Sequence, residues 1–558
     1  MYIKSMHIEN YRNLRDVTLH FHESMNYLVG ENAIGKSSFL RLLSLICKGQ
    51  VIPEQDYADV TRPIVVTLEL VLLRPGDQGF AFDRQEDRRT VTLRLEKNVE
   101  EFLPRLYNLD SGELVPPEII RCVRYLENAS FHDPGETPVW VYRAVEEKLE
   151  TVLHVRAENL TPCIREFITR EVQVGNRDTS YYVNIFLLSR YLRRQDCPVA
   201  DNMKFISLVA LRLLTQIYEM MQSHAAPLER SLIIDENGKR LLPLWVSIDE
   251  PEIHLHPYMQ RSILQYYQEL LENRDPKFCK VLHELFHIDG LRGQLFVVTH
   301  ATDSLAGDYR HIIRFYRNDA QQVQAACGSA FSFDEEIEKH LLMHFPEVKE
   351  SLYSRSVLIV EGETEYGCFR YFGKTLQVPF DYYGICLINA RGESSIGKIK
   401  TLLEAFHIPV AALYDGDVKR LRCHEKQVYF TDEICFEMDL VTRLLQVGKR
   451  RELDRIINAA AGGHGRATAD MLKRACRKLA INYHDYPPKL LQHVNSRNYQ
   501  ALCVYYFAWL YSNKGVILGR LIGQSLQAEE IPPAFCRVIR AAGTFASVRG
   551  KQEKEMNL

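Results

Sequence analysis

Residues Gly30 to Ser38 read GENAIGKSS, and this stretch decides the fold of the first part of the chain. It fits the spacing G-x-x-x-x-G-K-[ST] and lies between an apolar stretch typical of a strand, Asn26 to Val29, and an apolar helical pattern, Phe39 to Ile46. Glycines at both ends let the backbone curl into a nest of N–H donors, and the helix that follows adds its positive N-terminal dipole. The stretch therefore predicts a strand, a phosphate-binding loop and a helix.

The side chains of this loop suit a nucleotide and its magnesium ion. Lys36 brings a point charge to the β- and γ-phosphates, and Ser37 brings a hydroxyl to the metal. The residues that we expect to contact the nucleotide here are Gly30, Asn32, Gly35, Lys36, Ser37 and Ser38. The alternative is a glycine turn that only caps the helix.

Two later apolar stretches each end in residues that fit the same site. Leu244 to Ile248 ends in Asp249 and Glu250, where one carboxylate can hold Mg²⁺ and its neighbour can polarise water. Gln294 to Thr299 ends in His300, which is well placed to contact a γ-phosphate. Each signal alone is typical of a solvated strand end or a structural histidine, but their order along the chain favours one nucleotide site.

Four segments resemble the ABC-type ATPase heads of the SMC and RecF-like group: IENYRN (8–13), GENAIGKSS (30–38), SIDEPEIHLHP (247–257) and VVTH (297–300). The resemblance implies that Asp249 is the Walker B aspartate, Glu250 the catalytic glutamate and His300 the switch histidine. Such heads work in pairs, because a signature loop of the partner completes each nucleotide site. The expected position of that loop, before the helical pattern Met203 to Met220, reads CPVADN (197–202) without an LSGG-like motif. Hydrolysis of ATP and sensing of ATP therefore both remain open.

A second set of chemically distinctive residues is acidic and lies further along the chain. In VLIVEGETE (357–365), Glu361 ends an apolar strand and Glu365 follows one helical turn later, so both can face one site. In LYDGD, Asp415 and Asp417 follow a second strand, and strand alternation predicts that they project on the same side. The two pairs therefore predict a carboxylate cluster at one edge of a sheet.

Two more acids, Glu437 and Asp439, occur in CFEMDL (435–440), and the role of Asp439 stays open because one more residue along a strand or loop can turn it away. A cluster of carboxylates without His or Cys suits Mg²⁺ or Mn²⁺ rather than Zn²⁺. Such a cluster can hold two metal ions about 3.5–4 Å apart for in-line attack on a phosphodiester. Acidic residues that merely solvate strand ends are the alternative, which the order VEGETE then DGD disfavours.

This pair of motifs resembles the Toprim domain of topoisomerases, primases and recombination nucleases. An ABC-type head followed directly by a Toprim domain resembles the OLD (overcoming lysogenization defect) family of ATP-dependent nucleases, over residues 1 to about 525. The resemblance implies that Glu361 is a metal ligand or general acid/base. The metal-binding residues that it implies are Glu361, Glu365, Asp415, Asp417 and Glu437, with Ser37 and Asp249 holding the nucleotide's Mg²⁺.

The resemblance also assigns a late active-site lysine, Lys514 in SNKGVILGRL (512–521). A lysine there can stabilise the extra negative charge on pentavalent phosphorus. An ordinary phosphate contact or a solvated surface position is the alternative for Lys514. The residues that we expect to be catalytic are thus Glu361, Lys514 and, in the head, Glu250.

The predicted fold class is α/β. It comprises an ABC/SMC-like P-loop ATPase domain with a helical insertion, a Toprim domain with a Rossmann-like parallel sheet, and a helical C-terminal extension. We expect residues 1–98 and 201–328 to form the two parts of the head, 99–200 the insertion, 329–525 the Toprim nuclease domain and 526–558 a C-terminal tail. The family resemblance suggests the insertion as a dimerisation element.

Composition excludes several classes of protein. With 46% hydrophobic and 25% charged residues, the chain is an ordinary globular protein rather than a disordered or fibrous one. None of the 13 cysteines forms a CxxC pair, which indicates reduced and mostly buried thiols. No apolar run approaches the roughly 18 residues of a membrane span, and the N-terminus has no apolar signal-peptide core. We therefore expect a cytoplasmic protein.

Charge is divided unevenly along the chain. From Leu440 to the C-terminus, 19 Lys and Arg stand against 8 Asp and Glu, a balance of +11, whereas the first 439 residues hold 50 and 64, a balance of −14. The basic clusters KRREL (449–453) and KRACRK (473–478), with aromatic residues nearby, suit a path for a nucleic-acid backbone. The apolar run ALCVYYFAWLY (501–511) favours a place in the core over a base-stacking platform.

Together these observations predict an ATP-regulated DNA endonuclease that uses ATP and two Mg²⁺ or Mn²⁺ ions. By resemblance, it would be a homodimer or higher oligomer in bacterial defence against phages. A companion protein is also expected, either helicase-like or a reverse transcriptase with its DNA product. Two alternatives stay open. One is a regulatory or structural ATP-binding module whose Toprim domain binds nucleic acid or a partner without cutting, and the other is a nuclease that acts on RNA such as tRNA.

Overall fold

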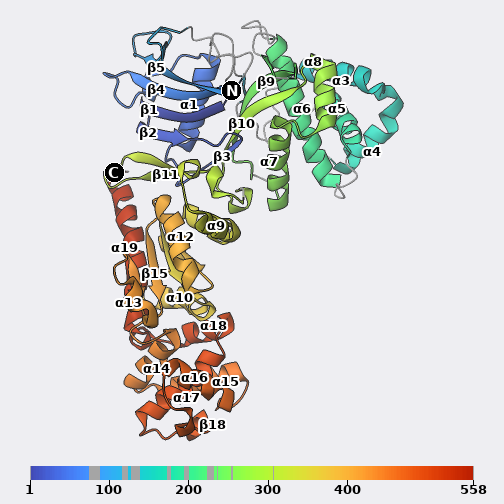
Figure 1. Ribbon diagram of the computed structural model, residues 1–558. Coiled ribbons are helices and arrows are strands. Elements are labelled where there is room, and N and C mark those ends of the chain that lie inside the picture. The colour runs from blue at the N-terminus through green and yellow to red at the C-terminus, as the bar shows by residue number, and fades with distance from the viewer. Residues whose placement is uncertain are drawn as a thin grey trace. The chain divides into compact units, whose positions relative to one another are not determined.

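The computed structural model describes residues 2–73, 88–115, 124–126, 138–171, 178–193, 200–222, 232–235, 237–252, 255–305 and 307–556. The chain divides into two units, Met1–Phe331 and Ser332–Leu558 (Figure 1). One expectation falls partly outside the described residues, because residues 197–199 belong to the segment where a signature loop is expected. Among the helices that are described, none has the length and apolar character needed to cross a membrane.

The first sheet of the first unit is antiparallel, in the order β2-β1-β4-β5-β6. Its strands are β1 (Tyr2–Tyr11), β2 (Leu14–His20), β4 (Ile64–Leu73), β5 (Arg88–Lys97) and β6 (Arg105–Asn108). One face is apolar because alternate residues such as Met6 and Ile8 in β1 point inward and are fully buried. This face packs on the same core as the helix that follows the GENAIGKS loop.

The second sheet holds the nucleotide-binding motifs, in the order β12-β11-β3-β10-β9-β7, with β8 paired to β9. Its strands are β3 (Met25–Val29), β7 (Arg124–Leu126), β8 (Ile233–Ile234), β9 (Arg240–Asp249), β10 (Gly290–Val298), β11 (Ile312–Arg317) and β12 (Val323–Cys327). The central strands β11, β3, β10, β9 and β7 run parallel, so their carboxyl ends meet at one edge. The register sets Val298 of β10 opposite both Leu28 and Asp249, which brings the three motifs side by side.

Helices of the first unit pack on this sheet or on one another (Figure 1). They are α1 (Lys36–Lys48), α3 (Val139–Leu153), α4 (Thr161–Glu171), α5 (Thr179–Tyr191), α6 (Ala200–Gln222), α7 (Pro257–Leu271) and α8 (Pro276–Phe286). Within residues 99–200, β6 and β7 join the two sheets of the head, so the described helices of this range begin at Val139. The α/β head with helices added to it agrees with the predicted fold class.

The second unit is built on a parallel four-stranded sheet, β14-β13-β15-β16. Its strands are β13 (Ser356–Val360), β14 (Ile385–Asn389), β15 (Val410–Tyr414) and β16 (Val428–Phe430). Strands β13, β14 and β15 are connected by α10 (Glu363–Thr375) and α12 (Glu393–Ala405), which confirms the predicted βαβ arrangement. The C-terminal helix α19 (Pro533–Met556) packs on β13 and β15, because its buried face carries Phe535, Val538 and Ala542.

A helical part continues from this sheet. Its elements are α14 (Phe436–Gln446), α15 (Arg450–Ala461), β17 (Arg466–Ala467), α16 (Ala469–Leu479), β18 (Lys489–Leu490), α17 (Tyr499–Ser512) and α18 (Val516–Ser525). Every residue of α17 from Leu502 to Leu510 is buried, so the apolar run forms core, as its composition favoured. The four-stranded parallel sheet and this helical part share one continuous hydrophobic core.

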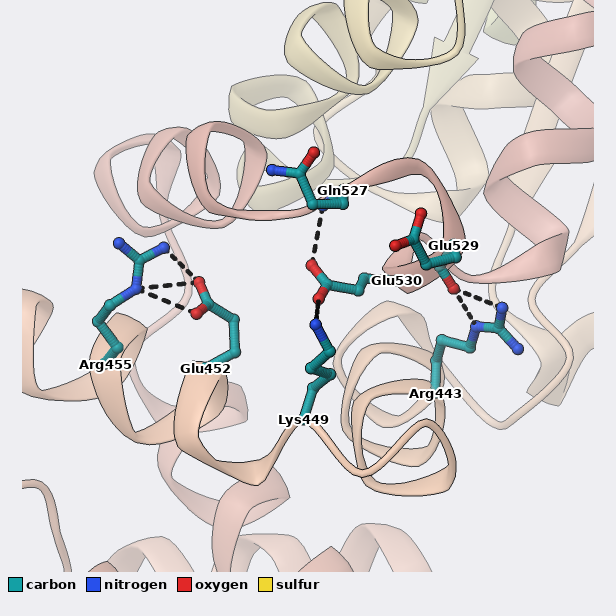
Figure 2. A network of polar contacts seen from close by, with 7 residues as sticks. All are labelled: Arg443, Lys449, Glu452, Arg455, Gln527, Glu529 and Glu530. Atoms are coloured by element: carbon teal, nitrogen blue, oxygen red, sulfur yellow. Dashed lines mark hydrogen bonds and ion pairs between the residues drawn. The ribbon is translucent and has the colours of Figure 1, made fainter.

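A polar network ties α14 and α15 to the segment that precedes α19 (Figure 2). The buried carboxylate of Glu530 accepts a hydrogen bond from the backbone N–H of Gln527 at 2.8 Å and pairs with Lys449 Nζ at 2.7 Å. Arg443 of α14 donates to the backbone carbonyl of Glu529, with Nε at 3.1 Å. These contacts hold the far end of α14, whose first turn carries Glu437.

Helices α10 and α18 approach so closely that only glycines fit between them. A Cβ on Gly519 would lie 2.2 Å from the carbonyl oxygen of Thr364, and one on Gly367 would lie 2.5 Å from the carbonyl oxygen of Val516. At the start of α18, the backbone N–H of Gly515 donates to Thr364 Oγ1 at 3.1 Å. The contact therefore sets the residue before Gly515, Lys514, against the start of α10.

Candidate nucleotide and carboxylate sites

The GENAIGKS loop follows β3 and leads into α1, and two glycines make its path possible. Gly30 and Gly35 have φ angles of 138° and 125°, which residues with a Cβ rarely adopt. Space is also limiting, because a Cβ on Gly30 would lie 2.6 Å from the carbonyl oxygen of Phe315. Asn13 Nδ2 donates to the carbonyl of Ala33 at 3.2 Å and so braces the loop tip.

Lys36 is folded back into this loop. Its Nζ donates to the carbonyl oxygens of Gly30 at 2.9 Å and Glu31 at 2.7 Å, and the side chain is buried. Burial lowers the pKa of Lys36 to about 8, although the carboxylates of Asp249 and Glu250 oppose the shift. The Lys36 ammonium thus donates to two neutral carbonyl oxygens, and the charged oxygens of a phosphate would bind it more strongly.

Asp249 and Ser37 meet at the end of β9, as the motif order predicts. Ser37 Oγ donates to Asp249 Oδ2 at 3.3 Å. The pKa of Asp249 is raised by burial and by the neighbouring charge of Glu250. Of the remaining predicted contacts, Asn32 is exposed on the loop and Ser38 is partly buried in the first turn of α1.

Glu250 and His300 lie together beyond the strand ends, with 3.7 Å between His300 Nε2 and Glu250 Oε1. Glu250 has a φ of 51°, and its N–H donates to the carbonyl of Val298 at 2.8 Å. Glu252, which the sequence reasoning missed, accepts the His300 N–H at 2.6 Å and the Thr299 hydroxyl at 2.9 Å. Glu252 therefore positions the His300 loop, and its signal was the third acid in the DEPE run.

Lys36→Ala is expected to weaken ATP binding by about 10- to 100-fold, because charge-assisted hydrogen bonds contribute about 1.5–3 kcal/mol each. The matched control is Lys48→Ala, which removes an exposed lysine from the last turn of the same helix. Titration of a fluorescent ATP analogue measures both variants. Wild-type affinity in Lys36→Ala would show that the loop does not hold the phosphates.

In the second unit, the predicted acids come together at the carboxyl ends of β13 and β15. Glu361 directly follows β13, and Glu365 is buried in the first turn of α10. Asp415 follows β15 and accepts a hydrogen bond from the backbone N–H of Phe436 at 3.3 Å. Glu437 is buried in the first turn of α14 with 1% of its surface exposed, so CFEMDL starts a helix and is not the strand or loop that we expected.

Asp417 requires a second correction. Residues Gly416–Val418 form a short 3₁₀ turn, so strand alternation does not apply to Asp415 and Asp417. Gly416 of this turn lies against the loop after β16, where a Cβ would lie 2.1 Å from the carbonyl oxygen of Glu433. Asp417 instead forms an ion pair with Lys478 of α16.

The carboxyl groups of this cluster are harder to ionise than free carboxyl groups. Burial and the charge of Glu361 raise the pKa of Asp415 to about 7. Burial, then Glu437 and Asp415, raise the pKa of Glu365, and burial raises that of Glu361. Since each carboxyl opposes ionisation of the others, the group as a whole is stabilised by an added cation.

Lys514 is the cation that the chain itself supplies. Its Nζ lies 3.0 Å from Glu437 Oε2 and 4.7 Å from the centre of the Tyr511 ring. Burial acts to lower the pKa of Lys514, but Glu437 and Glu365 outweigh it and raise the pKa above its ordinary value. Neither oxygen of Glu437 accepts a hydrogen bond of regular geometry, so its buried carboxylate retains capacity for a further ligand.

The chemistry of these carboxylates suits a metal ion, although their positions do not form a complete coordination site. Among the residues that the structure describes, no three His, Cys, Asp or Glu side chains are grouped closely enough to hold a metal ion as they stand. Two of the acids are paired with lysines instead, Asp417 with Lys478 and Glu437 with Lys514. The donors are hard oxygens, mutually repelling and partly unsatisfied, which suits a divalent ion of the Mg²⁺ or Mn²⁺ type.

Comparisons with known proteins agree with both sites. Residues 352–417 match the family model of the overcoming lysogenization defect protein-like TOPRIM domain. The second unit carries an OLD-like Toprim domain. Residues 1–98 match the AAA ATPase domain model. Domains of these two kinds imply the use of nucleotide and divalent metal, and they confirm the resemblance on which the sequence reasoning relied.

Individual relatives of this chain are distant. The OLD nuclease of Thermus scotoductus is 20% identical over 470 residues, which cover 75% of this chain and 82% of that protein. The C-terminal region of the Burkholderia pseudomallei OLD protein has a TM-score of 0.23 and 15% identity, covering 35% of this chain and 99% of its own. The SMC head domain from Thermotoga maritima has a TM-score of 0.25 and 13% identity, covering 58% and 98%. The homology to an OLD nuclease supports an ATPase-linked nuclease.

In the second unit, Asp439 supports the loop that follows β16. Its Oδ2 accepts the backbone N–H of Asp432 at 2.9 Å, and its Oδ1 accepts that of Glu433. The same loop contains Thr431, whose Oγ1 accepts the N–H of Gly416 at 2.7 Å and donates to the carbonyl of Glu433 at 2.8 Å. Asp439 and Thr431 therefore hold the Asp415–Asp417 turn in place, and sequence reasoning had identified neither in that role.

Proposed function

We propose that this protein is an ATP-regulated, divalent-metal-dependent DNA endonuclease. The observation that carries the proposal is the cluster of Glu361, Glu365, Asp415 and Glu437 at the carboxyl end of a parallel sheet, with Lys514 beside it. Glu365 and Glu437 are buried, and Glu361 and Asp415 are partly buried. A surface that only bound a polyanion would gain nothing from buried carboxylates facing phosphate. The cluster has a clear function if divalent cations bind both these carboxylates and a phosphodiester.

In the proposed reaction, a water oxygen attacks phosphorus while the bond from phosphorus to the leaving oxygen breaks. Two Mg²⁺ or Mn²⁺ ions, when bound by the five carboxylates, supply the positive charge that offsets the phosphate and acidifies the attacking water. Glu361 takes a proton from the attacking water or gives one to the leaving oxygen, and its raised pKa suits either transfer. Lys514 stabilises the additional charge on the phosphoryl oxygens, since its Nζ already lies among these carboxylates.

The head is proposed to control this reaction through ATP. Lys36, Ser37 and the loop N–H groups hold the phosphates, Asp249 holds the associated Mg²⁺, and Glu250 acts beside His300. The family resemblance supports a homodimer or higher oligomer, a companion protein and a role in defence against phages. The missing LSGG-like motif makes ATP sensing without rapid turnover the specific form that we propose.

The proposed function is tested with purified protein, supercoiled DNA, linear DNA and tRNA, each with Mg²⁺ or Mn²⁺ and with or without ATP. We expect nicking of supercoiled DNA that needs the metal and changes with ATP. Cleavage of tRNA alone would replace DNA by RNA as the substrate. The absence of any cleavage, with metal-dependent binding retained, would identify a regulatory module instead.

A further inference from the structure

Lys478 is the one described lysine of α16 that contacts a predicted metal-binding carboxylate. It lies in the last turn of the helix, and its Nζ pairs with Asp417 Oδ2, 61 positions away in the sequence. The two side chains are 29% and 39% exposed, so the pair is reachable from solvent on one side. Lys478 is thus located where substrate would approach the most exposed acid of the site.

The rest of α16 presents further positive charge. Leu472, Ala475 and Cys476 bury one face of the helix against the core, and α16 packs on α17. The basic residues on its other faces are Lys473, Arg474 and Arg477, all of which are exposed. A helical face with cations at successive turns can follow a phosphate backbone, and here it ends beside the carboxylate cluster.

The contact between Lys478 and Asp417 conflicts with metal binding. Asp417 Oδ2 cannot serve the ammonium and a divalent ion fully at the same time, and like charges repel at such distances. Once Asp417 binds a divalent ion, the Lys478 ammonium loses its partner at the edge of a site whose negative charge is then largely neutralised. A phosphate group beside the carboxylates is the anion best placed to replace Asp417 as its partner.

We propose that Lys478 exchanges partners, from Asp417 in the metal-free protein to a backbone phosphate of the nucleic acid when Asp417 takes up a divalent ion, and that α16 guides that backbone into the site. The proposal deepens the proposed nuclease function and rests on it. It assigns Lys478 two opposed effects: it competes with metal in the free protein and contributes to substrate binding in the metal-bound one.

The first measurement uses Mn²⁺ alone, titrated into the full-length chain, with free Mn²⁺ followed by its electron paramagnetic resonance signal. Lys478→Ala is expected to bind Mn²⁺ about two- to fivefold more tightly than wild type, because a partly exposed ion pair no longer competes. The matched control is Arg474→Ala, which removes the same charge one turn earlier on the helix and should leave Mn²⁺ affinity unchanged. Unchanged or weaker Mn²⁺ binding in Lys478→Ala would overturn the exchange.

The second measurement is the salt dependence of binding to a duplex with phosphorothioate linkages, which resists cleavage. With Mn²⁺ present, Lys478→Ala should reduce the slope of log K against log salt by about 1, and Arg474→Ala should do the same. In EDTA, only Arg474→Ala should change the slope, since Lys478 is then held by Asp417. Equal slopes for Lys478→Ala and wild type in Mn²⁺ would remove the phosphate contact.

Failure of this inference is distinguishable from failure of the proposed function. If wild type binds no Mn²⁺, or if Asp415→Ala binds as much Mn²⁺ as wild type, the carboxylate site is not a metal site and the nuclease proposal is wrong. If wild type binds Mn²⁺ at that site and cuts, but Lys478→Ala behaves as wild type in both measurements, only the exchange is wrong. Lys478→Arg, which keeps the charge, should restore the salt slope.

Discussion

Asp415→Ala is expected to lower metal-dependent cleavage by well over about 100-fold, because even the partners that merely orient metal ligands contribute about 10- to 100-fold. Asp415 lies at the centre of the cluster, where it interacts electrostatically with Glu361, Lys514 and Glu437. Replacement of Asp415 removes one proposed metal ligand and the carboxylate that interacts with both Glu361 and Glu437. Plasmid nicking in Mg²⁺ and in Mn²⁺ measures the effect.

The same substitution should not lower the stability of the metal-free protein. Asp415 is a partly buried carboxyl whose pKa is raised to about 7 by desolvation and by like charge, so its removal relieves repulsion within the cluster. This gain offsets the lost hydrogen bond from the Phe436 N–H. The melting temperature in EDTA is therefore expected to equal or exceed that of wild type.

Asp381→Ala is the matched control, because Asp381 is an acid of the same unit that is 85% exposed and paired with Arg370 on the surface. It should leave nicking unchanged. Retention of wild-type nicking in Asp415→Ala would remove the carboxylate cluster from the reaction. A fall in melting temperature by many degrees would show instead that Asp415 is a structural acid.

The second large effect is expected from Gly519→Ala in the contact between α10 and α18. The new Cβ would lie 2.2 Å from the carbonyl oxygen of Thr364, a backbone atom that cannot rotate away. Overpacking of this kind costs about 3 kcal/mol, and here the two helices must separate to accept it. Separation moves Lys514 away from Glu437, so cleavage should fall together with stability.

Gly397→Ala is the control for this change. Gly397 is also a helical glycine, but a Cβ there would meet only Arg422 Nη1 at 3.5 Å and the Tyr414 hydroxyl at 3.7 Å, which are ordinary contacts. Replacement of glycine by alanine inside α12 should stabilise the protein by up to about 1 kcal/mol. Chemical denaturation of both variants tests the contrast, and equal stabilities would refute the tight packing of α10 on α18.

Local motifs predicted the parts of the molecule that local chemistry controls. The loop at Gly30 to Ser38 could be identified because strand, turn and helix follow one another within a short stretch. The same holds for Glu361 and Glu365, which a strand end and one helical turn bring together. Parallel strand order then placed Asp249 and His300 at the same edge as that loop.

Distant contacts defeated the sequence reasoning at particular residues. The turn at Asp415 to Asp417 depends on close approach of the Glu433 carbonyl to Gly416, which no pattern around DGD reveals. The helix that contains Glu437 had a sequence signal, since Phe436, Leu440 and Leu444 recur at helical spacing. The acidic residues Glu437 and Asp439 instead favoured the interpretation of a strand or loop. Lys478 was seen only as part of a basic cluster, because its partner lies 61 residues earlier.

The backbone contact between α10 and α18 also bears on how this protein can be altered. Thr364 and Gly519 meet through main-chain atoms, so this contact near Lys514 is made without any side chain of residues 447–498, which lie between α14 and α17. That lobe contributes none of the five proposed metal-binding acids, yet it carries α16 and its exposed cations. The exposed positions of α16 other than Lys478 can therefore be exchanged to retarget the protein to another polyanion, while Lys478 keeps its pairing with Asp417 and Lys514 keeps its pairing with Glu437.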